Sequence, residues 1–450
     1  MIHSRRGPNT VVCFFSVERS PPPTSFPHPP LRTSRPRRWR LRPKQASPTS
    51  RTVLTVVALV LTLVAGAWGG PKYKVLHAFG QGQDGAGTWG SLLLDKKGNL
   101  YGTTGGGGLY GYGTAFELTP QSNDNWSETI LHNFDRNGQD GYGSTANLVF
   151  GNDRILYGTT TWGGIYDYGT VFELTLGSGV WNENVIFSFD VNDGARPYSG
   201  MAMGKGGVLY GTAGVVFELA PGSDGWTESV IDYFLNHNDG NGPFAGPIVD
   251  ANGNLYGTTE WGGTHNMGVV YELSPNADGA WKEQILHDFC PEGPPHCPDG
   301  HTPIVGALTM DIFGNVYGTT GGGGYCCGTV FRLMRQADGR WKETVLYNFK
   351  GGASGYGPGA GVVRDNAGNL YGTTVYGGSS QCDCGVVFEL SPRKSGRWKY
   401  TVLHAFIGYD GAQPDANLTL DSKGNLYGTT ATGGAGGYGV AFELTPNSRP

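Results

Sequence analysis

The chain has 450 residues, and its 32 Lys and Arg and 37 Asp and Glu are unevenly placed. Residues 1–67 hold eleven basic residues and one acidic residue, which leaves 21 basic and 36 acidic residues, a formal charge of about −15. Such an acidic body excludes nucleic acid as the expected partner, because phosphate binding needs a basic face. With 77 glycines and 12% aromatic residues the chain does not have a disordered composition, and many short strands with tight turns are expected.

The chain begins with a Pro- and Arg-rich segment, residues 1–50, which has no apolar periodicity and is expected to be disordered. Arg51, the apolar run Val53–Val64 and Ala65-Gly66-Ala67 then make the pattern of a secretory signal peptide over residues 51–67. We therefore expect an exported bacterial protein, secreted or held at the cell surface, with no membrane span in its mature chain. An uncleaved signal anchor is the alternative. Because a signal rarely has so long a leader, we hypothesise that translation starts near position 50.

One unit of about fifty residues is repeated seven times after the signal. Each copy has four short segments rich in β-branched and aromatic residues, which predict strands A to D. Strand B holds Tyr-Gly-Thr, strand C resembles Gly-Thr-Val-Phe-Glu-Leu, and strand D resembles Trp-x-Glu-x-Val-Leu-His-x-Phe. An Asp-x-x-Gly-Asn turn joins strands A and B in five copies, as at Asp95–Asn99. Strand B begins its Tyr-Gly-Thr at Tyr101, Tyr157, Tyr210, Tyr256, Tyr317, Tyr371 and Tyr427.

The two ends of the repeat array are out of phase. A lone strand D, residues 74–79, comes first, whereas the last unit stops after its strand C, residues 440–445. The strands are complete only if the first strand fills the last unit, which closes a ring without exposed edges. The sequence therefore predicts an all-β fold, a seven-bladed β-propeller of four-stranded antiparallel blades over residues 71–447. An open solenoid, which needs caps, is the alternative.

The motifs Asn-Leu-Tyr-Gly-Thr-Thr, Gly-Gly, Gly-Thr-Val-Phe-Glu-Leu-Thr-Pro, Trp and Val-Leu-His-x-Phe run through residues 73–446. They closely resemble the bacterial Gloeo–Verruco (GloVer) tandem repeat. This resemblance implies a secreted or surface-attached protein and no particular biochemical activity. The order of strand B, paired Gly, strand C and Trp is also loosely similar to kelch blades. Some kelch-type propellers are copper oxidases, but no matching ligand set occurs in this sequence.

Several groups of chemically active residues occupy repeated positions. His77, His132, His287 and His404 share one position of strand D, so they are expected to lie in separate blades and not to share a metal ion. The strand C glutamates are repeated in the same way, whereas catalytic carboxylates need two different environments. We therefore predict no catalytic residues and no metal site. These glutamates are Glu117, Glu173, Glu218, Glu272, Glu389 and Glu443.

The B–C and D–A loops share one face of a propeller, and aromatic residues recur in them. Trp162, Trp261 and Tyr376 precede Gly-Gly pairs in B–C loops, and Trp89, Tyr142 and Tyr198 lie in D–A loops. Exposed rings beside glycine suit the stacking of sugar rings or peptide side chains. We predict Trp89, Trp162, Trp261 and Tyr376 as ligand-binding residues. The alternative is that these rings merely cover glycine-rich loops.

The same face holds acidic and sulfur-containing residues. Asp-Gly recurs in the D–A loops, and two of these loops faintly resemble calcium loops. Turn formation is the favoured role of these aspartates, so no cofactor is predicted. Calcium binding is the alternative that stays open. Export favours disulfides. Cys290–Cys297 is the favoured pair, whereas Cys326, Cys327, Cys382 and Cys384 allow three pairings or a metal site.

The third unit departs from the repeat, because Tyr210 and Phe217 enclose a much shorter B–C loop than in the other copies. This predicts a notch in the loop face beside Trp162 and Trp261. Together these features predict a monomeric binding propeller that presents its loop face to a glycan, peptide or protein ligand. A secreted carbohydrate-active hydrolase or lyase with its site at the channel mouth is the alternative, and a purely structural envelope protein is a third interpretation.

Overall fold

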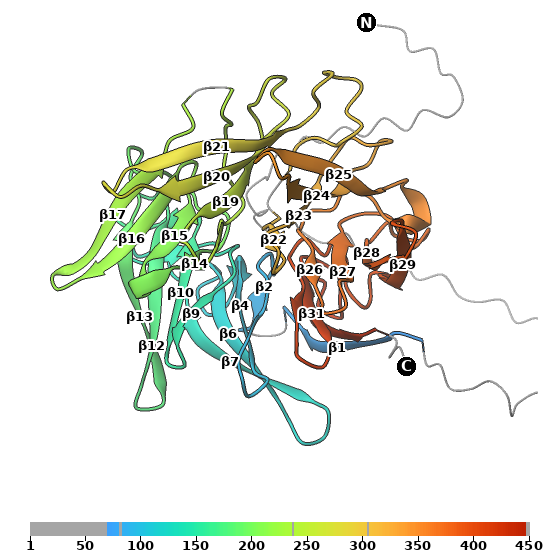
Figure 1. Ribbon diagram of the computed structural model, residues 1–450. Helices are drawn as coiled ribbons and strands as arrows, with labels where there is room; N and C mark the ends of the chain where they lie inside the picture. Colours follow the sequence, from blue (N-terminus) through green and yellow to red (C-terminus); the bar gives the residue numbers. More distant parts are fainter. Residues whose placement is uncertain (1–69, 81–82, 236–237, 304–305, 447–450) are drawn as a thin grey trace, which may run out of the picture. The chain divides into compact units, whose positions relative to one another are not determined.

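The described residues of the computed structural model are 70–446, apart from residues 81–82, 236–237 and 304–305. The predictions for residues 1–50 and 51–67 lie outside the described residues. The described part forms seven four-stranded antiparallel sheets, which are the blades of a β-propeller (Figure 1). This confirms the fold that the repeat predicts. No helix among the described residues is long and apolar enough to span a membrane.

The blades are numbered in chain order, and their strands A to D are given from the central channel outwards. Blade 1 consists of β3 (Leu93–Leu94), β4 (Leu100–Thr104), β6 (Thr114–Pro120) and β7 (Trp126–Asn133). Blade 2 consists of β9 (Val149–Asn152), β10 (Ile155–Thr160), β12 (Thr170–Gly177) and β13 (Val180–Ser188). Blade 3 consists of β14 (Ala202–Met203), β15 (Leu209–Thr212), β16 (Val216–Gly222) and β17 (Gly225–Asp232).

The remaining blades repeat this order. Blade 4 consists of β18 (Ile248–Val249), β19 (Leu255–Thr259), β20 (Val269–Pro275) and β21 (Trp281–Asp288). Blade 5 consists of β22 (Thr309–Met310), β23 (Val316–Thr320), β24 (Thr329–Arg335) and β25 (Trp341–Asn348). Blade 6 consists of β26 (Val363–Arg364), β27 (Leu370–Thr374), β28 (Val386–Pro392) and β29 (Trp398–Ala405). Blade 7 consists of β30 (Thr419–Leu420), β31 (Leu426–Thr430), β32 (Val440–Thr445) and β1 (Lys72–Ala78).

Short two-stranded ribbons lie on the loop face. In blade 1, β2 (Gly85–Ala86) pairs with β5 (Gly106–Gly107), and in blade 2, β8 (Gly141–Tyr142) pairs with β11 (Trp162–Gly163). These ribbons join a D–A loop to the following B–C loop. Of the two 3-10 turns among the described residues, Gly352–Ser354 lies in the D–A loop before blade 6, whereas Lys205–Gly207 joins strands A and B of blade 3.

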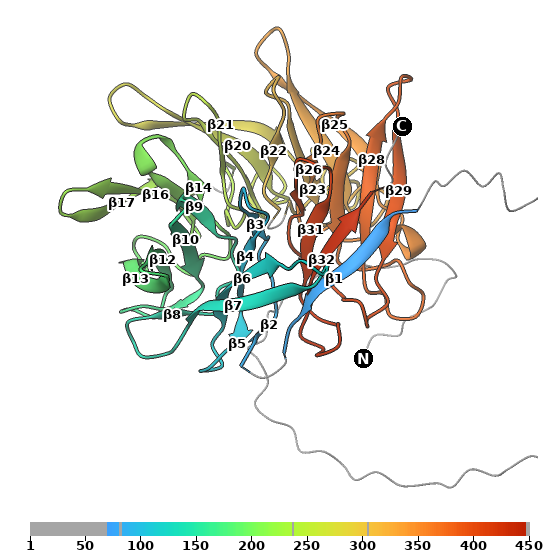
Figure 2. The same ribbon diagram turned by 90° about the horizontal axis from the view of Figure 1, so that it is seen from below.

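The strand that closes the ring is β1. It pairs antiparallel with β32, from Lys72 opposite Thr445 to Ala78 opposite Val440. Figure 2 shows the blue β1 lying along the red β32. The first segment of the repeat array therefore completes the last blade, as its phase predicts. This pairing covers the edge that β32 would otherwise expose.

The core lies between neighbouring blades and explains two invariable features of the repeat. A buried aromatic ring lies just after each strand D and packs on a strand C ring of the next blade, as Phe79 packs on Phe116 with ring centroids 5.1 Å apart. The strand B glycine makes room for that second ring. At Gly102 a Cβ atom would lie 2.6 Å from Phe116 Cζ, so a larger residue would displace the ring.

The A–B turn and strand C are joined through the strand B tyrosine. Asp95 accepts backbone hydrogen bonds from Lys97 and Asn99 at 2.7 and 2.8 Å, which is the turn role expected of this aspartate. The hydroxyl of Tyr101 donates to Glu117 at 2.8 Å. Tyr256 and Glu272 form the same bond at 3.0 Å. Glu117 and Glu272 thus each have a structural partner within their own blade.

Candidate functional site

A cavity of about 300 Å³ lies at the mouth of the central channel. Its lining comes from all seven blades and consists of strand A residues and the loop residues just before them. Many of the lining residues have small side chains or none, as at Ala146, Gly200, Ala307 and Ala360. Because the same segment of each repeat faces the channel, side chains from different blades, such as Trp89 and Asp415, lie around one shared space.

One loop position before strand A differs from blade to blade. It holds Trp89, Thr145, Tyr198, Phe244, Gly359 and Asp415 in the described blades 1, 2, 3, 4, 6 and 7. Four of these, Trp89, Thr145, Tyr198 and Asp415, line the channel cavity, together with the amides of Asn147 and Asn417. Aromatic surface therefore comes from blades 1 and 3, and a carboxylate comes from blade 7. Among the described residues that line the cavity, Asp415 is the one carboxylate.

Asp415 lies directly beside the corresponding loop of blade 6. A Cβ atom on Gly359 would lie 1.7 Å from the Oδ1 atom of Asp415, so a larger residue at this position would displace the Asp415 side chain. In the same way, a Cβ atom on Gly200 would meet the side chain of Asn147 at 2.4 Å. The absence of side chains at these two glycines lets polar groups of neighbouring blades lie close together at the channel mouth.

An aromatic track leads outwards from the channel mouth. The ring of Tyr198 meets Phe244 edge-on, with centroids 5.7 Å apart, and Phe244 meets Trp261 in the same way at 5.8 Å. Trp261 is 42% exposed, so the outer end of the track faces solvent. The track joins the D–A loops before blades 3 and 4 to the B–C loop of blade 4.

The four predicted ligand-binding aromatics are thus placed in different settings. Trp89 lines the channel cavity, and Trp261 ends the track that starts at Tyr198. Trp162 lies half-buried in blade 2, with the Arg196 guanidinium 4.2 Å from its ring centroid. Tyr376 stacks on Tyr356 in blade 6, with centroids 5.3 Å apart. The structure does not gather all four, although each lies in the loops where the repeat places it.

In blade 3 the B–C loop shrinks to the short turn between β15 and β16. Ala213 donates a backbone hydrogen bond to the Val215 carbonyl at 3.0 Å, and both side chains are buried. The track of Tyr198, Phe244 and Trp261 runs beside this blade. The notch predicted there stays a prediction.

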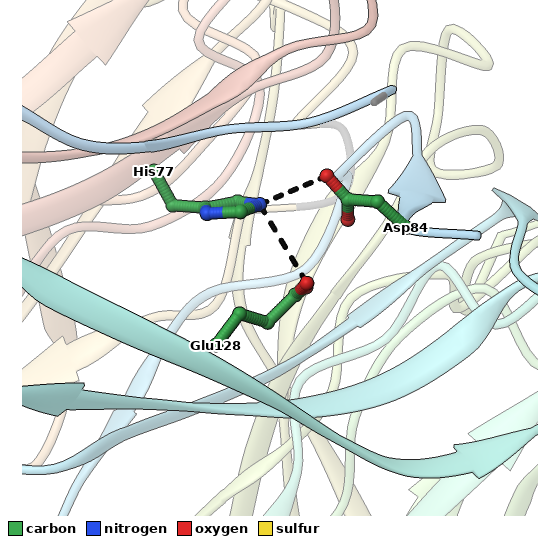
Figure 3. A group of neighbouring side chains, drawn as sticks. All are labelled: His77, Asp84 and Glu128. Carbon is green, nitrogen blue, oxygen red and sulfur yellow. Dashed lines mark hydrogen bonds and ion pairs between the residues drawn. The ribbon is translucent and has the colours of Figure 1, made fainter. Parts of the chain in front are cut away.

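The strand D histidines do not share a site, as expected from their repeated position. Each lies within 3.0 Å of an aspartate in its own D–A loop, as His77 Nε2 lies 2.9 Å from Asp84 Oδ2 (Figure 3). These aspartates also accept backbone N–H groups, as Asp140 does from Asp135. These aspartates therefore stabilise the backbone of their own loops, as the turn interpretation predicts. The other pairs are His132 with Asp140, His287 with Asp299, and His404 with Asp410.

The structure adds a third group that the repeat pattern does not reveal. The strand D glutamate of the next blade, Glu128, lies 3.8 Å from His77 Nε2 (Figure 3), and Glu183 joins His132 and Asp140 in the same way. Burial raises the pKa of Glu128 to about 7, with His77 opposing this rise and Asp84 adding to it. Burial likewise raises the pKa of Glu183 to about 7. The sequence does show this glutamate as a repeated residue of strand D. It does not show the contact, because the partners of the glutamate lie in the neighbouring unit.

Tyrosine replaces this glutamate at two interfaces. Tyr73 stacks on His404, with centroids 3.8 Å apart, and donates a hydrogen bond to the Asp410 carbonyl at 2.6 Å. Tyr400 stacks on Tyr347, with centroids 4.2 Å apart. The same outer position therefore joins neighbouring blades by a carboxylate at some interfaces and by an aromatic ring at others.

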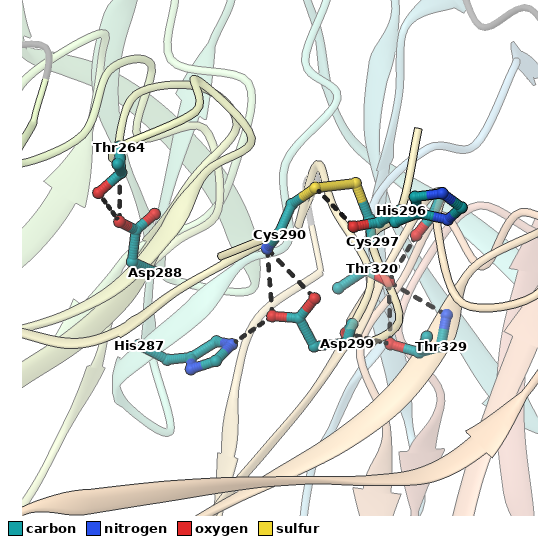
Figure 4. Close-up of polar contacts among 10 residues, drawn as sticks. Thr264, His287, Asp288, Cys290, His296, Cys297, Asp299, Thr320 and Thr329 are labelled. Atoms are coloured by element: carbon teal, nitrogen blue, oxygen red, sulfur yellow. Dashed lines mark hydrogen bonds and ion pairs between the residues drawn. A yellow bond between two sulfur atoms is a disulfide. The ribbon is translucent and has the colours of Figure 1, made fainter. Parts of the chain in front are cut away.

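The cysteines lie in the loops after strand D of blade 4 and in the B–C loops of blades 5 and 6. Cys290 and Cys297 are bonded, with an S–S distance of 2.04 Å, as the sequence favours (Figure 4). The pairings that the sequence leaves open are Cys326–Cys327 and Cys382–Cys384. Figure 4 also shows Asp299 between His287 and the backbone of Cys290. The first disulfide thus closes the loop that presents this aspartate.

The family model of the Gloeobacter/Verrucomicrobia repeat matches residues 62–215, 212–343 and 299–449. The chain belongs to this family. The match confirms the resemblance that the repeated motifs indicate. The sequence matches none of the curated proteins.

Several solved structures match most of the chain at low identity. A protein named as an oxidoreductase (glucose dehydrogenase) of Thermus thermophilus is 16% identical, with TM-score 0.43, over 83% of this chain and 100% of its own. PorZ, a surface component of the type-IX secretion system of Porphyromonas gingivalis, is 15% identical, with TM-score 0.49, over 82% and 48%. A protein named as a 6-phosphogluconolactonase of Bacteroides uniformis is 14% identical, with TM-score 0.47, over 73% and 88%. None of these likenesses bears on the function of this chain.

Proposed function

We propose that this protein is a secreted or cell-surface binding propeller that holds a glycan at the mouth of its central channel. The observation that carries this proposal is the unrepeated ring around the cavity of about 300 Å³. Trp89 and Tyr198 offer aromatic surface, while Asp415 and two asparagine amides offer polar contacts. Sugar rings present both apolar faces and hydroxyl groups, so this combination suits them.

The size and polarity of the cavity favour binding of a small part of a ligand over binding of a protein surface. A volume of about 300 Å³ is at the lower end of the usual range for small-molecule sites. The track from Tyr198 to the exposed ring of Trp261 offers further stacking surface for a longer chain of sugars. We expect the reducing or non-reducing end of a glycan to enter the channel mouth and the rest to follow the track.

A carbohydrate-active enzyme is less well supported by this site. The usual glycosidase mechanism needs two carboxyl groups on either side of the scissile bond. Asp415 is the one carboxylate among the described residues that line the cavity. A single carboxylate with amides and aromatic rings suits binding better than hydrolysis.

A glycan array with the purified full-length chain tests the proposal. We expect selective binding to a class of glycans, reduced at least about tenfold by Trp89→Ala and by Asp415→Asn, which is about 1.4 kcal/mol. Tyr409→Ala is the matched control, because Tyr409 is an exposed loop aromatic that does not line the cavity. Its binding should equal that of the wild type.

Two results would contradict this function. One is a wild-type protein that binds no glycan on the array. The other is binding that Trp89→Ala and Asp415→Asn leave unchanged. Release of sugar products from a bound glycan, lost in Asp415→Asn, would instead support the enzyme interpretation.

A further inference from the structure

We propose that two of the seven blade interfaces each bind a divalent metal ion of the Zn²⁺ class, one at His77, Asp84 and Glu128 and one at His132, Asp140 and Glu183. The first lies between blades 7 and 1 (the 7/1 interface), and the second lies between blades 1 and 2 (the 1/2 interface). This inference is independent of the glycan site at the channel mouth, because none of these residues lines that cavity.

The ligand atoms already converge. In each cluster one imidazole nitrogen and two carboxylate oxygens lie within 4.8 Å of one another. At the 7/1 interface, His77 Nε2 is 2.9 Å from Asp84 Oδ2 and 3.8 Å from Glu128 Oε2. Ligand atoms that each lie about 2.0–2.2 Å from one Zn²⁺ ion are separated from one another by distances similar to these two. Figure 3 shows the three side chains pointing toward one another.

The carboxylates have unused acceptor atoms inside the protein. The side chain of Asp84 is 6% exposed and that of Asp140 is 8% exposed. The Oδ1 atom of each has no hydrogen-bond partner among the described residues, nor has the Oε1 atom of Glu128 or of Glu183. A buried acceptor without a partner costs about 1–3 kcal/mol. A cation bound between the two carboxylates would offset the repulsion between them, and it would also satisfy these oxygens where a carboxylate binds it through both of its oxygen atoms.

The donor set selects the kind of ion. One neutral imidazole with two carboxylates suits Zn²⁺ and related transition ions, whereas Ca²⁺ prefers sites made entirely of oxygen atoms. The 1/2 cluster also opens to an outer cavity of about 640 Å³, which His132, Asp140 and Glu183 line. An ion can therefore reach this cluster without unfolding of the blades.

Among the described residues, no other blade interface brings three such ligand atoms together. At the 4/5 interface, His287, Asp299 and Glu343 have the same residue types, yet they do not bring three ligand atoms within 4.8 Å. There the backbone N–H of Cys290 approaches both oxygens of Asp299, at 3.2 and 3.1 Å (Figure 4). At the 6/7 interface, the Tyr73 ring lies against His404 where a glutamate would be the third ligand. These interfaces are internal controls within one chain.

Ion binding at the 7/1 interface would have a structural consequence. His77 belongs to β1, the strand that closes the ring, and Glu128 belongs to β7 of blade 1. An ion held by both residues would join the closing strand to the next blade. Because the ion binds the folded ring and not the unfolded chain, it would stabilise the closed propeller.

Calorimetric titration of the full chain with Zn²⁺ at pH 7.5, after treatment with a chelator, tests the proposal. We expect two ions per chain in the wild type, one in Glu128→Gln, one in Glu183→Gln and none in the double variant. Glu343→Gln is the matched control and should keep two ions. Zn²⁺ should raise the melting temperature of the wild type by about 2–5 °C and leave that of the double variant unchanged.

The melting temperature of each variant without metal is the folding control, because it shows whether a loss of ion binding comes from unfolding. The proposal is overturned if the wild type binds no Zn²⁺. It is equally overturned if the folded double variant binds as many ions as the wild type, since the ions then lie elsewhere. Binding of Ca²⁺ in place of Zn²⁺ would also contradict the donor set assigned here.

Discussion

The blade interfaces of this propeller are of two kinds at one and the same outer position. Between blades 7 and 1, and onwards to blades 4 and 5, strand D presents a glutamate to the preceding blade, as Glu128 and Glu343 do. At the last two interfaces it presents Tyr400 and Tyr73, which stack on Tyr347 and His404. The comparison teaches that one backbone position accommodates two kinds of side chain. The glutamates titrate near neutral pH, and the tyrosines do not.

The largest effect is expected at the strand where the two kinds of interface meet. Deletion of residues 71–80 removes β1, which carries Tyr73 toward blade 6 and His77 toward blade 1. It also removes Leu76 and Phe79, both buried. Since burying such side chains contributes about 2–5 kcal/mol each, we expect a loss of about 5 kcal/mol or more, measured by urea unfolding.

A circular permutant sharpens this test. Lys72 lies opposite Thr445, so a two-residue Asn-Gly turn can join the end of β32 to the start of β1. We expect this permutant, with β1 moved to the end of the chain, to recover most of the lost stability. Wild-type stability in the deletion variant would mean that β1 does not close the ring.

A smaller effect is expected from pH at the glutamate interfaces. Burial raises the pKa of Glu343 to about 8, and it raises the pKa values of Glu228 and Glu283 to about 7, as for Glu128 and Glu183. The folded state therefore holds protons that the unfolded state releases above about pH 4.5. This stabilisation is present at low pH and is lost as the pH rises through about 7–8. The melting temperature, measured with a chelator present, should be higher at pH 5.5 than at pH 8.

Replacing the most strongly shifted glutamate checks the cause of that slope. Glu343→Gln removes one titrating group, so the melting temperature should rise at pH 8 and change little at pH 5.5. Burial lowers the pKa of His404, which opposes the trend below about pH 6.5. A protein more stable at pH 8 than at pH 5.5, or a variant with an unchanged slope, would refute the role of these glutamates.

The smallest effect is expected at a tyrosine interface. Tyr73→Phe keeps the ring stacked on His404 and removes the hydrogen bond from the Tyr73 hydroxyl to the Asp410 carbonyl, 2.6 Å long. We expect a loss of about 1–2 kcal/mol in the free energy of unfolding, equal at pH 5.5 and pH 8. Tyr409→Phe is the control, because Tyr409 is 87% exposed and its loss should cost nothing measurable. A pH-dependent loss in Tyr73→Phe would erase the distinction between the two kinds of interface.

Much of the fold follows from local features of the repeat. Tyr-Gly-Thr, the Asp-x-x-Gly-Asn turn and the Phe of strands C and D recur at fixed offsets, so strand order and core could be predicted within each unit. The candidate site was only partly predictable. Trp89 and Tyr198 stand out in the sequence as loop aromatics, but Thr145 and Asp415 do not, because neither residue is unusual in its own loop.

The sequence by itself determined the seven-bladed ring and its closure by β1, because these depend on a count of strands and on the phase of the two chain ends. The tertiary structure alone decided which residues of different units meet. Glu128 reaches His77, and Asp415 shares the channel mouth with Trp89, across separations that no motif spans. A repeat pattern compares equivalent positions, whereas blade interfaces and the channel bring together positions from different units. That is why the places left for binding chemistry appear only once the ring is closed.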